Sequence, residues 1–190
     1  MRFVWLTFVG LAAVIIGFFR PKAPEVTSRP IAVSIVARPD SLTADLSAAR
    51  TTARRPTPNA AKRDSIVLYA LQQLGTNYCY AGTTPATGFD CSGFVQYVFT
   101  HFQVPVPHST ALLIDVGRPV PRAQAQPGDI VVFTGTAKTS TTPGHAGIVV
   151  TAGPLRFVHS SSAKREPGVK VSQVEGTDYE RRFMQVRRVL

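Results

Sequence analysis

The residues best suited to chemistry in this chain are a cysteine and two histidines. Cys91 lies in the segment Gly88-Phe89-Asp90-Cys91-Ser92-Gly93, and His145 and His159 follow further along the sequence. A thiol near an imidazole can act as a nucleophile, because the imidazole accepts its proton, and a further polar group can orient that imidazole. These residue types therefore indicate nucleophilic catalysis, with one histidine as the base and the other as its orienter.

Cys91 is expected in the first turn of a helix. Asp90 stands just before it, where an N-cap residue belongs. Apolar residues with helical spacing follow, at Phe94, Val95, Val98, Phe99 and Phe102. The unpaired backbone N–H groups and the helix dipole there favour thiolate over thiol. The alternative is an inert core cysteine, because free cysteines are often buried as small hydrophobic residues.

The two histidines are predicted to meet across a β-hairpin. If residues 151–153 form a three-residue loop, Val150 faces Pro154, and counting back pairs His145 with His159. Paired residues on antiparallel strands point to the same face of the sheet. A slip of one residue would place them on opposite faces, so this prediction depends on the length of the loop.

The other two histidines and a metal site are the remaining candidates for chemistry. His101 and His108 have no such partner in the pattern, and a helix end and a loop are their expected places. Two histidines and a cysteine could bind zinc, but the sequence has no Cys-x-x-Cys or His-Glu-x-x-His pattern. We therefore expect neither a metal nor a cofactor.

Helices precede strands in the part of the chain that carries these residues. Ile66, Val67, Ala70, Leu71 and Leu74 form one helical face, which Gly75 ends. A short helix over 110–116 and strands over 130–133, 145–150, 154–159 and 184–189 follow. This order predicts an α+β domain, with N-terminal helices packed on a small antiparallel sheet.

The N-terminal third is different in composition. Residues 3–19 are uncharged, which is typical of a signal anchor or signal peptide over residues 1–19. No small-x-small cleavage site follows directly, which favours a membrane anchor. Residues 20–61 are rich in proline and basic side chains and are expected to form a linker, followed by a domain over 62–190. Much of the net charge of +10 lies before the domain, which argues against nucleic-acid binding on the folded surface.

From about residue 62 the sequence resembles the NlpC-type cell-wall cysteine peptidases, a compact papain-like family. The resemblance combines the segment around Cys91 with several further motifs in the family's order. These are Gly75-Thr76-Asn77-Tyr78-Cys79-Tyr80-Ala81-Gly82, Val106-Pro107-His108-Ser109, Gln126-Pro127-Gly128-Asp129-Ile130-Val131-Val132-Phe133, Gly144-His145-Ala146-Gly147-Ile148-Val149 and Phe157-Val158-His159-Ser160-Ser161.

The resemblance implies roles for individual residues. Cys91 would be the nucleophile, His145 the general base and His159 the residue that orients it. Tyr78 matches a tyrosine near the oxyanion site. Asp90 and Ser92 match positions near the free amine of the substrate. For Asp90, a role as N-cap alone is the alternative.

The chain also departs from the family. Ala81-Gly82 stands where the family usually has two glycines. Cys79 occupies a variable position, and a Cys79–Cys91 disulfide would inactivate the nucleophile.

By this resemblance the chain is an exported cysteine endopeptidase of the cell envelope, monomeric, with peptidoglycan as its partner. Its target would be an amide of the stem peptide, typically between D-glutamate and a diamino acid. Two other functions stay open: a thiol amidase or acyltransferase acting on another envelope substrate, and a non-catalytic wall-binding module.

Overall fold

The computed structural model describes residues 57–190, and the predicted membrane segment over 1–19 and most of the predicted linker lie outside them. The described chain contains four α-helices, one short 3-10 helix and eight β-strands. The helices are α2 (Pro58–Leu71), α3 (Cys91–His101), α4 (Thr110–Leu113), η1 (Arg122–Gln124) and α5 (Asp178–Arg182). Within residues 57–190, no helix is both long and apolar enough to cross a membrane.

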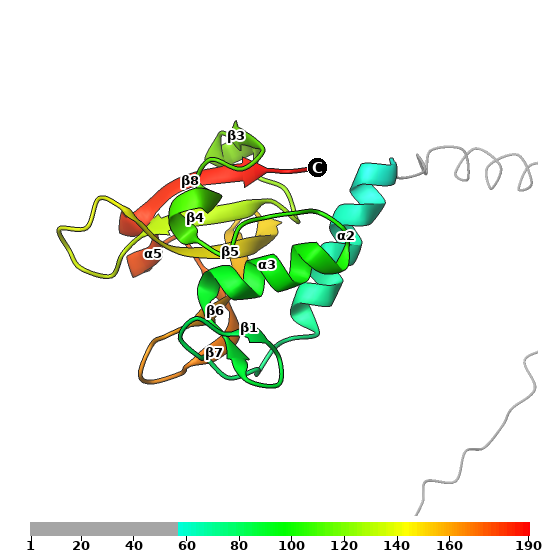
Figure 1. Cartoon of the computed structure of the whole chain (residues 1–190). Helices are drawn as coiled ribbons and strands as arrows, with labels where there is room; N and C mark the ends of the chain where they lie inside the picture. Colours follow the sequence, from blue (N-terminus) through cyan, green and yellow to red (C-terminus); the bar gives the residue numbers. More distant parts are fainter. Residues whose placement is uncertain (1–56) are drawn as a thin grey trace, which may run out of the picture. The chain divides into compact units, whose positions relative to one another are not determined.

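Six strands form one antiparallel sheet in the order β3-β8-β4-β5-β6-β7 (Figure 1). They are β3 (Arg118–Val120), β4 (Ile130–Thr134), β5 (Pro143–Ala152), β6 (Leu155–Ser161), β7 (Gly168–Gln173) and β8 (Phe183–Arg188). The remaining two, β1 (Thr83–Thr84) and β2 (Gly88–Phe89), form a small separate ribbon. The α+β class and the helices packed on an antiparallel sheet are confirmed.

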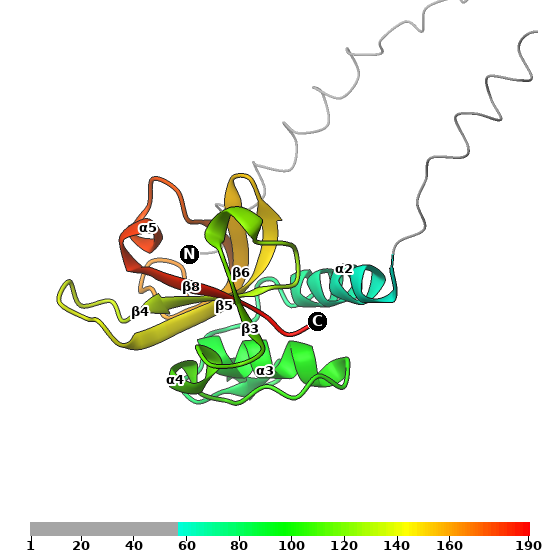
Figure 2. The ribbon, with the colours of Figure 1, turned by 90° about the horizontal axis from the view of Figure 1, so that it is seen from above.

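Each face of the sheet carries its own hydrophobic core. Ile130 and Val132 of β4 belong to the core shared with α2, α3 and α4. Val131 and Phe133, one residue further along each time, belong to the core on the other face, near α5. Figure 2 shows α3 and α5 on opposite sides of the sheet. Because β4 is covered on both faces, it is a continuous apolar run rather than an alternating one.

Three helix boundaries differ from the sequence-based expectation. Helix α2 begins at Pro58, with Thr57 as its N-cap, so it starts before the domain boundary expected at residue 62. It ends at Leu71, and Leu74, predicted on its buried face, is 49% exposed in the turn that follows. Helix α4 ends at Leu113 rather than near residue 116.

The loop before α3 packs tightly against the helix start. A Cβ atom on Gly93 would lie 2.1 Å from the carbonyl oxygen of Gly82, and one on Gly82 would lie 2.3 Å from that of Gly88. Ala81 adopts a φ of 56°, a left-handed conformation that glycine tolerates best. The close contact at Gly82 and the left-handed backbone at residue 81 explain why glycine suits positions 81 and 82. Ala81 adopts the left-handed conformation despite its methyl group.

Two sets of hydrogen bonds fix the helix side of the molecule to the sheet. The Ser160 hydroxyl on β6 donates to the carbonyl of Phe89 over 2.7 Å, just before α3 begins. The backbone of Val169 on β7 exchanges hydrogen bonds with Gly75 and Thr76, at 2.9 and 2.8 Å. The segment just before α3 is therefore held against β6, the strand that carries His159.

Candidate active site

Cys91 is the first residue of α3, as predicted, and Asp90 is its N-cap. The Oδ1 atom of Asp90 accepts from the backbone N–H of Gly93 over 2.6 Å. The Cys91 side chain is half-buried, and its Sγ lies 3.6 Å from Oγ1 of Thr110 in α4. Thr110 was not predicted, because its contact with Cys91 depends on how α4 packs against α3.

The Cys91 thiol is not pre-ionised in the manner expected of a cysteine at a helix start. Burial raises its pKa, since a thiolate loses hydration in a protein interior. The hydrogen bond with Thr110 and the backbone groups of Ala146 and Ser92 lower it, but the net shift is upward. We therefore correct the expectation of a resting thiolate, because desolvation outweighs the polar groups around the sulfur.

The two predicted histidines do meet on the sheet. Nε2 of His145 on β5 lies 2.8 Å from Nδ1 of His159 on β6, and both side chains are buried. The other ring nitrogen of His159, Nε2, lies 2.9 Å from the Oγ atom of Ser172 on β7. A continuous polar chain thus runs from His145 through His159 to Ser172, and its last member was not predicted.

The strand register behind this pair differs from the predicted one. Ile148 faces Val158 rather than Arg156, and the strands close at the pair Ala152–Leu155 with a register shift after Val149. The predicted direct pairing of His145 with His159 is therefore wrong by two residues. An even slip keeps side chains on the same face of a strand, so the two rings still converge, now diagonally.

A glycine makes room for this arrangement. A Cβ atom on Gly147 would lie 2.6 Å from the Phe157 ring and 3.0 Å from Cβ of His159. A side chain at this position would displace the ring that contacts His145.

Both histidines are held in the neutral form. Burial, followed by the positive charge of Arg182, lowers the pKa of His145 to about 3. Burial, followed by the charges of His145 and Lys170, also holds the pKa of His159 well below its usual value. At neutral pH the site therefore presents an uncharged imidazole and an uncharged thiol.

The positions predicted for substrate contact lie beside Cys91. Tyr78 is half-buried and forms an isolated backbone bridge with Phe89, directly before the N-cap. Burial raises the pKa of its phenol, and the charges of Cys91 and Asp90 contribute to the same shift. The Ser92 hydroxyl donates to Oδ1 of Asp90 over 3.1 Å.

His108 is a member of this group that the sequence-based reasoning missed. Its Nε2 lies 3.1 and 3.0 Å from the two carboxylate oxygens of Asp90. His108 lies in one of the family motifs, but its partner Asp90 is 18 residues away, so their contact is visible only in the fold. His101, in contrast, lies at the helix end as expected and stacks on Tyr69 at a ring distance of 3.9 Å.

The two cysteines are both free, so Cys79 does not block Cys91 in this structure. The Cys79 thiol instead lies 3.6 Å from the carbonyl oxygen of Tyr80. Among residues 57–190 no group of three histidine, cysteine or acidic side chains is placed to hold a metal ion.

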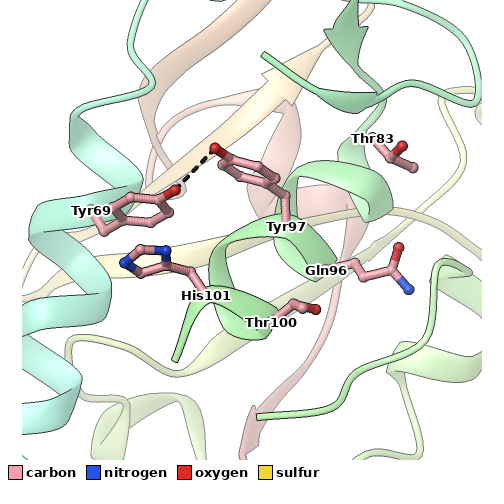
Figure 3. A pocket seen from close by; sticks show the side chains of 6 residues that line it. All are labelled: Tyr69, Thr83, Gln96, Tyr97, Thr100 and His101. Carbon is pink, nitrogen blue, oxygen red and sulfur yellow. Dashed lines mark hydrogen bonds between the residues drawn. The ribbon is translucent and has the colours of Figure 1, made fainter. Parts of the chain in front are cut away.

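A pocket between α2 and α3 lies apart from this group. It has a volume of about 540 Å³ and contains none of the predicted site residues (Figure 3). The hydroxyls of Tyr69 and Tyr97 meet there over 2.9 Å. Its lining residues are Tyr69, Thr83, Gln96, Tyr97, Thr100 and His101.

Known proteins share both this sequence pattern and this fold. The sequence profile of the NlpC/P60 family matches residues 75–188, the part that carries Cys91, His145 and His159. A γ-DL-glutamyl hydrolase of Bacillus subtilis is 39% identical over 115 residues, which cover 60% of this chain and 27% of that protein. The Escherichia coli protein named murein DD-endopeptidase MepS/murein LD-carboxypeptidase is 35% identical over 117 residues, covering 61% and 57%.

Solved structures agree with this relationship. The peptidoglycan hydrolase RipB of Mycobacterium tuberculosis superposes with a TM-score of 0.56 at 26% identity, over 72% of this chain and 69% of that one. An NlpC/P60 family protein of Bacillus cereus gives a TM-score of 0.60 at 25% identity, over 67% and 40%. The chain spans 27% and 57% of the two curated relatives named above. With its compact papain-like α+β domain, this chain belongs to the NlpC/P60 family.

Proposed function

We propose that this chain is a cysteine endopeptidase that hydrolyses amide bonds in the stem peptides of peptidoglycan. The observation that carries the proposal is the polar chain His145–His159–Ser172, which begins on β5 next to Ala146, whose backbone hydrogen-bonds the Cys91 thiol. The curated relatives bear the names of a γ-DL-glutamyl hydrolase and a murein endopeptidase, which supports peptidoglycan or a related polymer as the substrate.

The hydrogen bonds indicate which nitrogen of His145 acts as the base. Its Nε2 is engaged with His159, so Nδ1 is the nitrogen left for the Cys91 proton. If the Ser172 hydroxyl accepts from Nε2–H of His159, then Nδ1 of His159 accepts from Nε2–H of His145. This tautomer leaves a lone pair on Nδ1 of His145, as a general base requires.

The reaction then follows in two steps. Cys91 Sγ attacks the amide carbon while its proton moves to His145, and the carbonyl oxygen becomes an oxyanion. Backbone N–H groups at the start of α3, together with the Tyr78 phenol, would stabilise that charge. His145 gives its proton to the leaving amine, and the C–N bond breaks. Water, deprotonated by His145, then hydrolyses the thioester and restores the thiol.

We propose the bond between D-glutamate and the diamino acid as the target, and Asp90 and Ser92 as contacts of the substrate's free amine. The Asp90 carboxylate lies beside the nucleophile, where it can pair with a cationic ammonium group. The same proposal locates the chain, as a monomer, at the cell envelope, where its polymer substrate is found. We also propose that residues 1–19 anchor the chain in the membrane.

The direct test is digestion of purified peptidoglycan with the 190-residue chain under reducing conditions. Released fragments are identified by mass spectrometry, and the Cys91→Ala variant is the control. We expect stem-peptide fragments ending in D-glutamate from the native protein alone. Fragments cut at another amide would change the proposed bond. No fragments from a folded protein whose Cys91 can be alkylated would contradict the proposal and favour an acyl transfer to another substrate.

A wall-binding role without catalysis is the second candidate. A Mycobacterium tuberculosis protein of the same fold, RipD, is described as a non-catalytic NlpC/p60 domain protein adapted to peptidoglycan binding. Retention of Cys91, His145 and His159 in this chain favours the catalytic role. Sedimentation with peptidoglycan that persists without any turnover would favour binding alone.

A further inference from the structure

A second pocket adjoins the predicted base. It has a volume of about 330 Å³, and His145 forms part of its wall. Gly144 beside it on β5, the loop after β4, the end of β6 with the loop that follows it, and α5 contribute the rest. The side chains that matter below are Thr136, Ser161, Lys164, Tyr179 and Arg182.

The position of this pocket relates it to one half of the substrate. His145 must deliver its proton to the leaving amine, so the part of the substrate beyond the scissile bond lies against its ring. Cys91, Tyr78 and Asp90 do not line the pocket. The pocket therefore faces the leaving-group side of the bond, whereas the Asp90 group lies on the acyl side.

The charge in this pocket is positive. Lys164 is exposed at its rim, and the Arg182 side chain lies beneath, 6% exposed. None of the nine residues that line the pocket is acidic. Two long basic side chains without a carboxylate among the lining residues favour an anionic group of the ligand.

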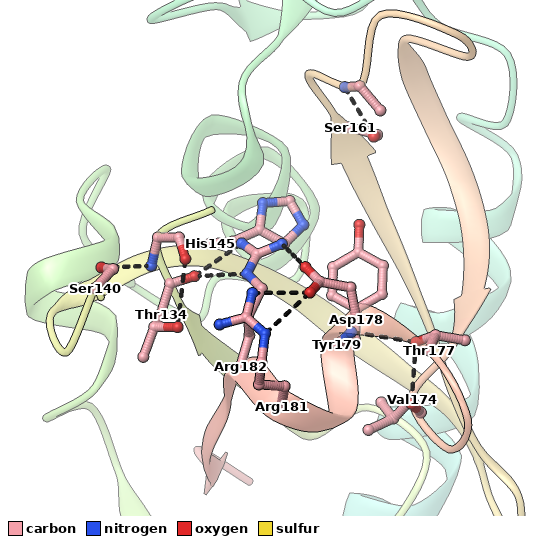
Figure 4. A network of polar contacts seen from close by, with 12 residues as sticks. Thr134, Ser140, His145, Ser161, Val174, Thr177, Asp178, Tyr179, Arg181 and Arg182 are labelled. Atoms are coloured by element: carbon pink, nitrogen blue, oxygen red, sulfur yellow. Dashed lines mark hydrogen bonds and ion pairs between the residues drawn. The ribbon is translucent and has the colours of Figure 1, made fainter. Parts of the chain in front are cut away.

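Arg182 is fixed in place without losing this charge. Its Nε and Nη2 donate to the carbonyl oxygen of Thr134, over 3.1 and 2.8 Å, and a carbonyl carries no net charge. The nearest carboxylate, Asp178, is 3.7 Å from Nη1 and is already bonded to Arg181 over 2.8 Å. Figure 4 shows the guanidinium of Arg182 beside the His145 ring. One carboxylate is thus shared between two arginines, which leaves an excess of positive charge.

Several hydroxyl groups are available to complete a carboxylate site. Ser161, Thr136 and Tyr179 contribute to the wall of the pocket. Ser161 and Tyr179 already hydrogen-bond each other, which leaves one hydroxyl hydrogen of that pair, and that of Thr136, to donate to a carboxylate oxygen. Tyr179 also stacks on His145, at a ring distance of 5.8 Å and an angle of 27°. A group bound here would therefore be held directly beside the base.

We infer that this pocket binds a free carboxylate on the residue that follows the scissile amide. Lys164 and Arg182 provide the charge, and the hydroxyls provide further donors. The inference rests on the proposed function, because a substrate has a leaving group only if the protein cleaves its amide bond. Together with Asp90, it makes the site electrically polar: a cationic group is favoured on the acyl side and an anionic group on the leaving side.

Binding to an inactive protein tests the inference separately from catalysis. In the full 190-residue chain with Cys91→Ala, calorimetry would compare the tripeptide L-Ala-γ-D-Glu-L-Lys, bearing a free terminal carboxylate, with its terminal carboxamide. We expect the acid to bind about tenfold more tightly than the amide. Adding Lys164→Met, which removes the charge but keeps an unbranched side chain, should reduce this ratio to within about twofold.

Arg165→Met is the matched control, because Arg165 is an exposed basic neighbour that does not line the pocket. It should leave the ratio of acid to amide affinity unchanged. Equal affinities in the Cys91→Ala protein, no binding of either peptide, or a ratio that survives Lys164→Met would overturn the inference. Failure of the proposed function shows separately, as absence of cleavage by the native chain.

Discussion

Two histidine contacts flank the site: His145 with His159 on the sheet, and His108 with Asp90 at the start of α3. They differ in burial and in the partner that the histidine binds. On the sheet side, His145 and His159 are 8% and 0% exposed and bond to one another. On the helix side, the His108 and Asp90 side chains are 28% and 15% exposed. Burial withholds the water that would stabilise an imidazolium, so the sheet pair is held neutral, the form that has a lone pair to accept a proton. The helix pair instead keeps the Asp90 carboxylate next to Cys91, the proposed nucleophile, where it suits a cationic ligand.

The comparison predicts very unequal effects of replacing the two histidines. His145→Gln should lower kcat/KM on peptidoglycan fragments about 1000-fold, because it removes the proposed base. His108→Gln should lower it less than about tenfold, because Asp90 stays bonded to Ser92 and Gly93. Rates of fragment release measured by mass spectrometry check both values. Similar losses in the two variants would mean that the sheet pair has no special part in catalysis.

The buried pair should also make stability depend on pH. The unfolded chain protonates His145 near its ordinary pKa of about 6.5, whereas the folded chain does so only near pH 3. Between these values the unfolded state binds more protons, so stability falls as the pH falls. From pH 7 to pH 5 the loss from His145 is about 2 kcal/mol, fully recovered on return to pH 7.

Urea unfolding at the two pH values measures this loss. The His145→Gln variant should show a smaller difference between pH 7 and pH 5, and His108→Gln should follow the native protein. An unchanged difference in His145→Gln would show that other groups, and not this imidazole, cause the acid sensitivity.

Ser172 should have an intermediate effect, because it acts only through His159. Ser172→Ala removes the partner of His159 Nε2 and with it the preference for one tautomer. We expect kcat to fall about tenfold, close to the value of one ordinary hydrogen bond, with KM unchanged. Ser172→Thr keeps the hydroxyl and should retain most of the rate. A rise in KM in place of the fall in kcat would contradict a positioning role.

Asp90 allows the helix cap to be separated from ligand binding. Asp90→Asn keeps an oxygen acceptor for the Gly93 N–H and removes the charge, whereas Asp90→Ala removes both. Thermal unfolding should show a loss of about 1 kcal/mol for alanine and only a few tenths for asparagine. If both variants also raise KM for a substrate with a free amine, the charge binds that amine. Unchanged KM in Asp90→Asn would leave Asp90 as a cap alone.

Much of the site could be predicted because it depends on local patterns. The N-cap Asp90, the helix that starts at Cys91 and the hairpin that brings the histidines together are all visible in short stretches of sequence. The pairing of the hairpin was wrong, yet the histidines still converge, because a slip of two residues preserves the face of each strand.

The missing parts depend on contacts between distant segments. Ser172 lies on β7, which was not predicted, although Val169 and Val171 alternate with polar residues there. Its contact with His159 exists only because β7 pairs with β6. Arg182 reaches the carbonyl of Thr134 across 48 residues. The raised pKa of Cys91 was also missed, since the helix start suggests a lowered value and only the packed structure reveals the cost of burial.

The most direct test of this account measures how the reactivity of Cys91 depends on pH. In a Cys79→Ser background, the rate of alkylation by iodoacetamide would be followed from pH 4 to pH 10. A neutral thiol beside a neutral imidazole predicts a rate that rises about tenfold per pH unit through neutrality, without a plateau. A plateau already reached near pH 5 would reveal a resting thiolate–imidazolium pair and would contradict the claim that burial keeps both groups uncharged.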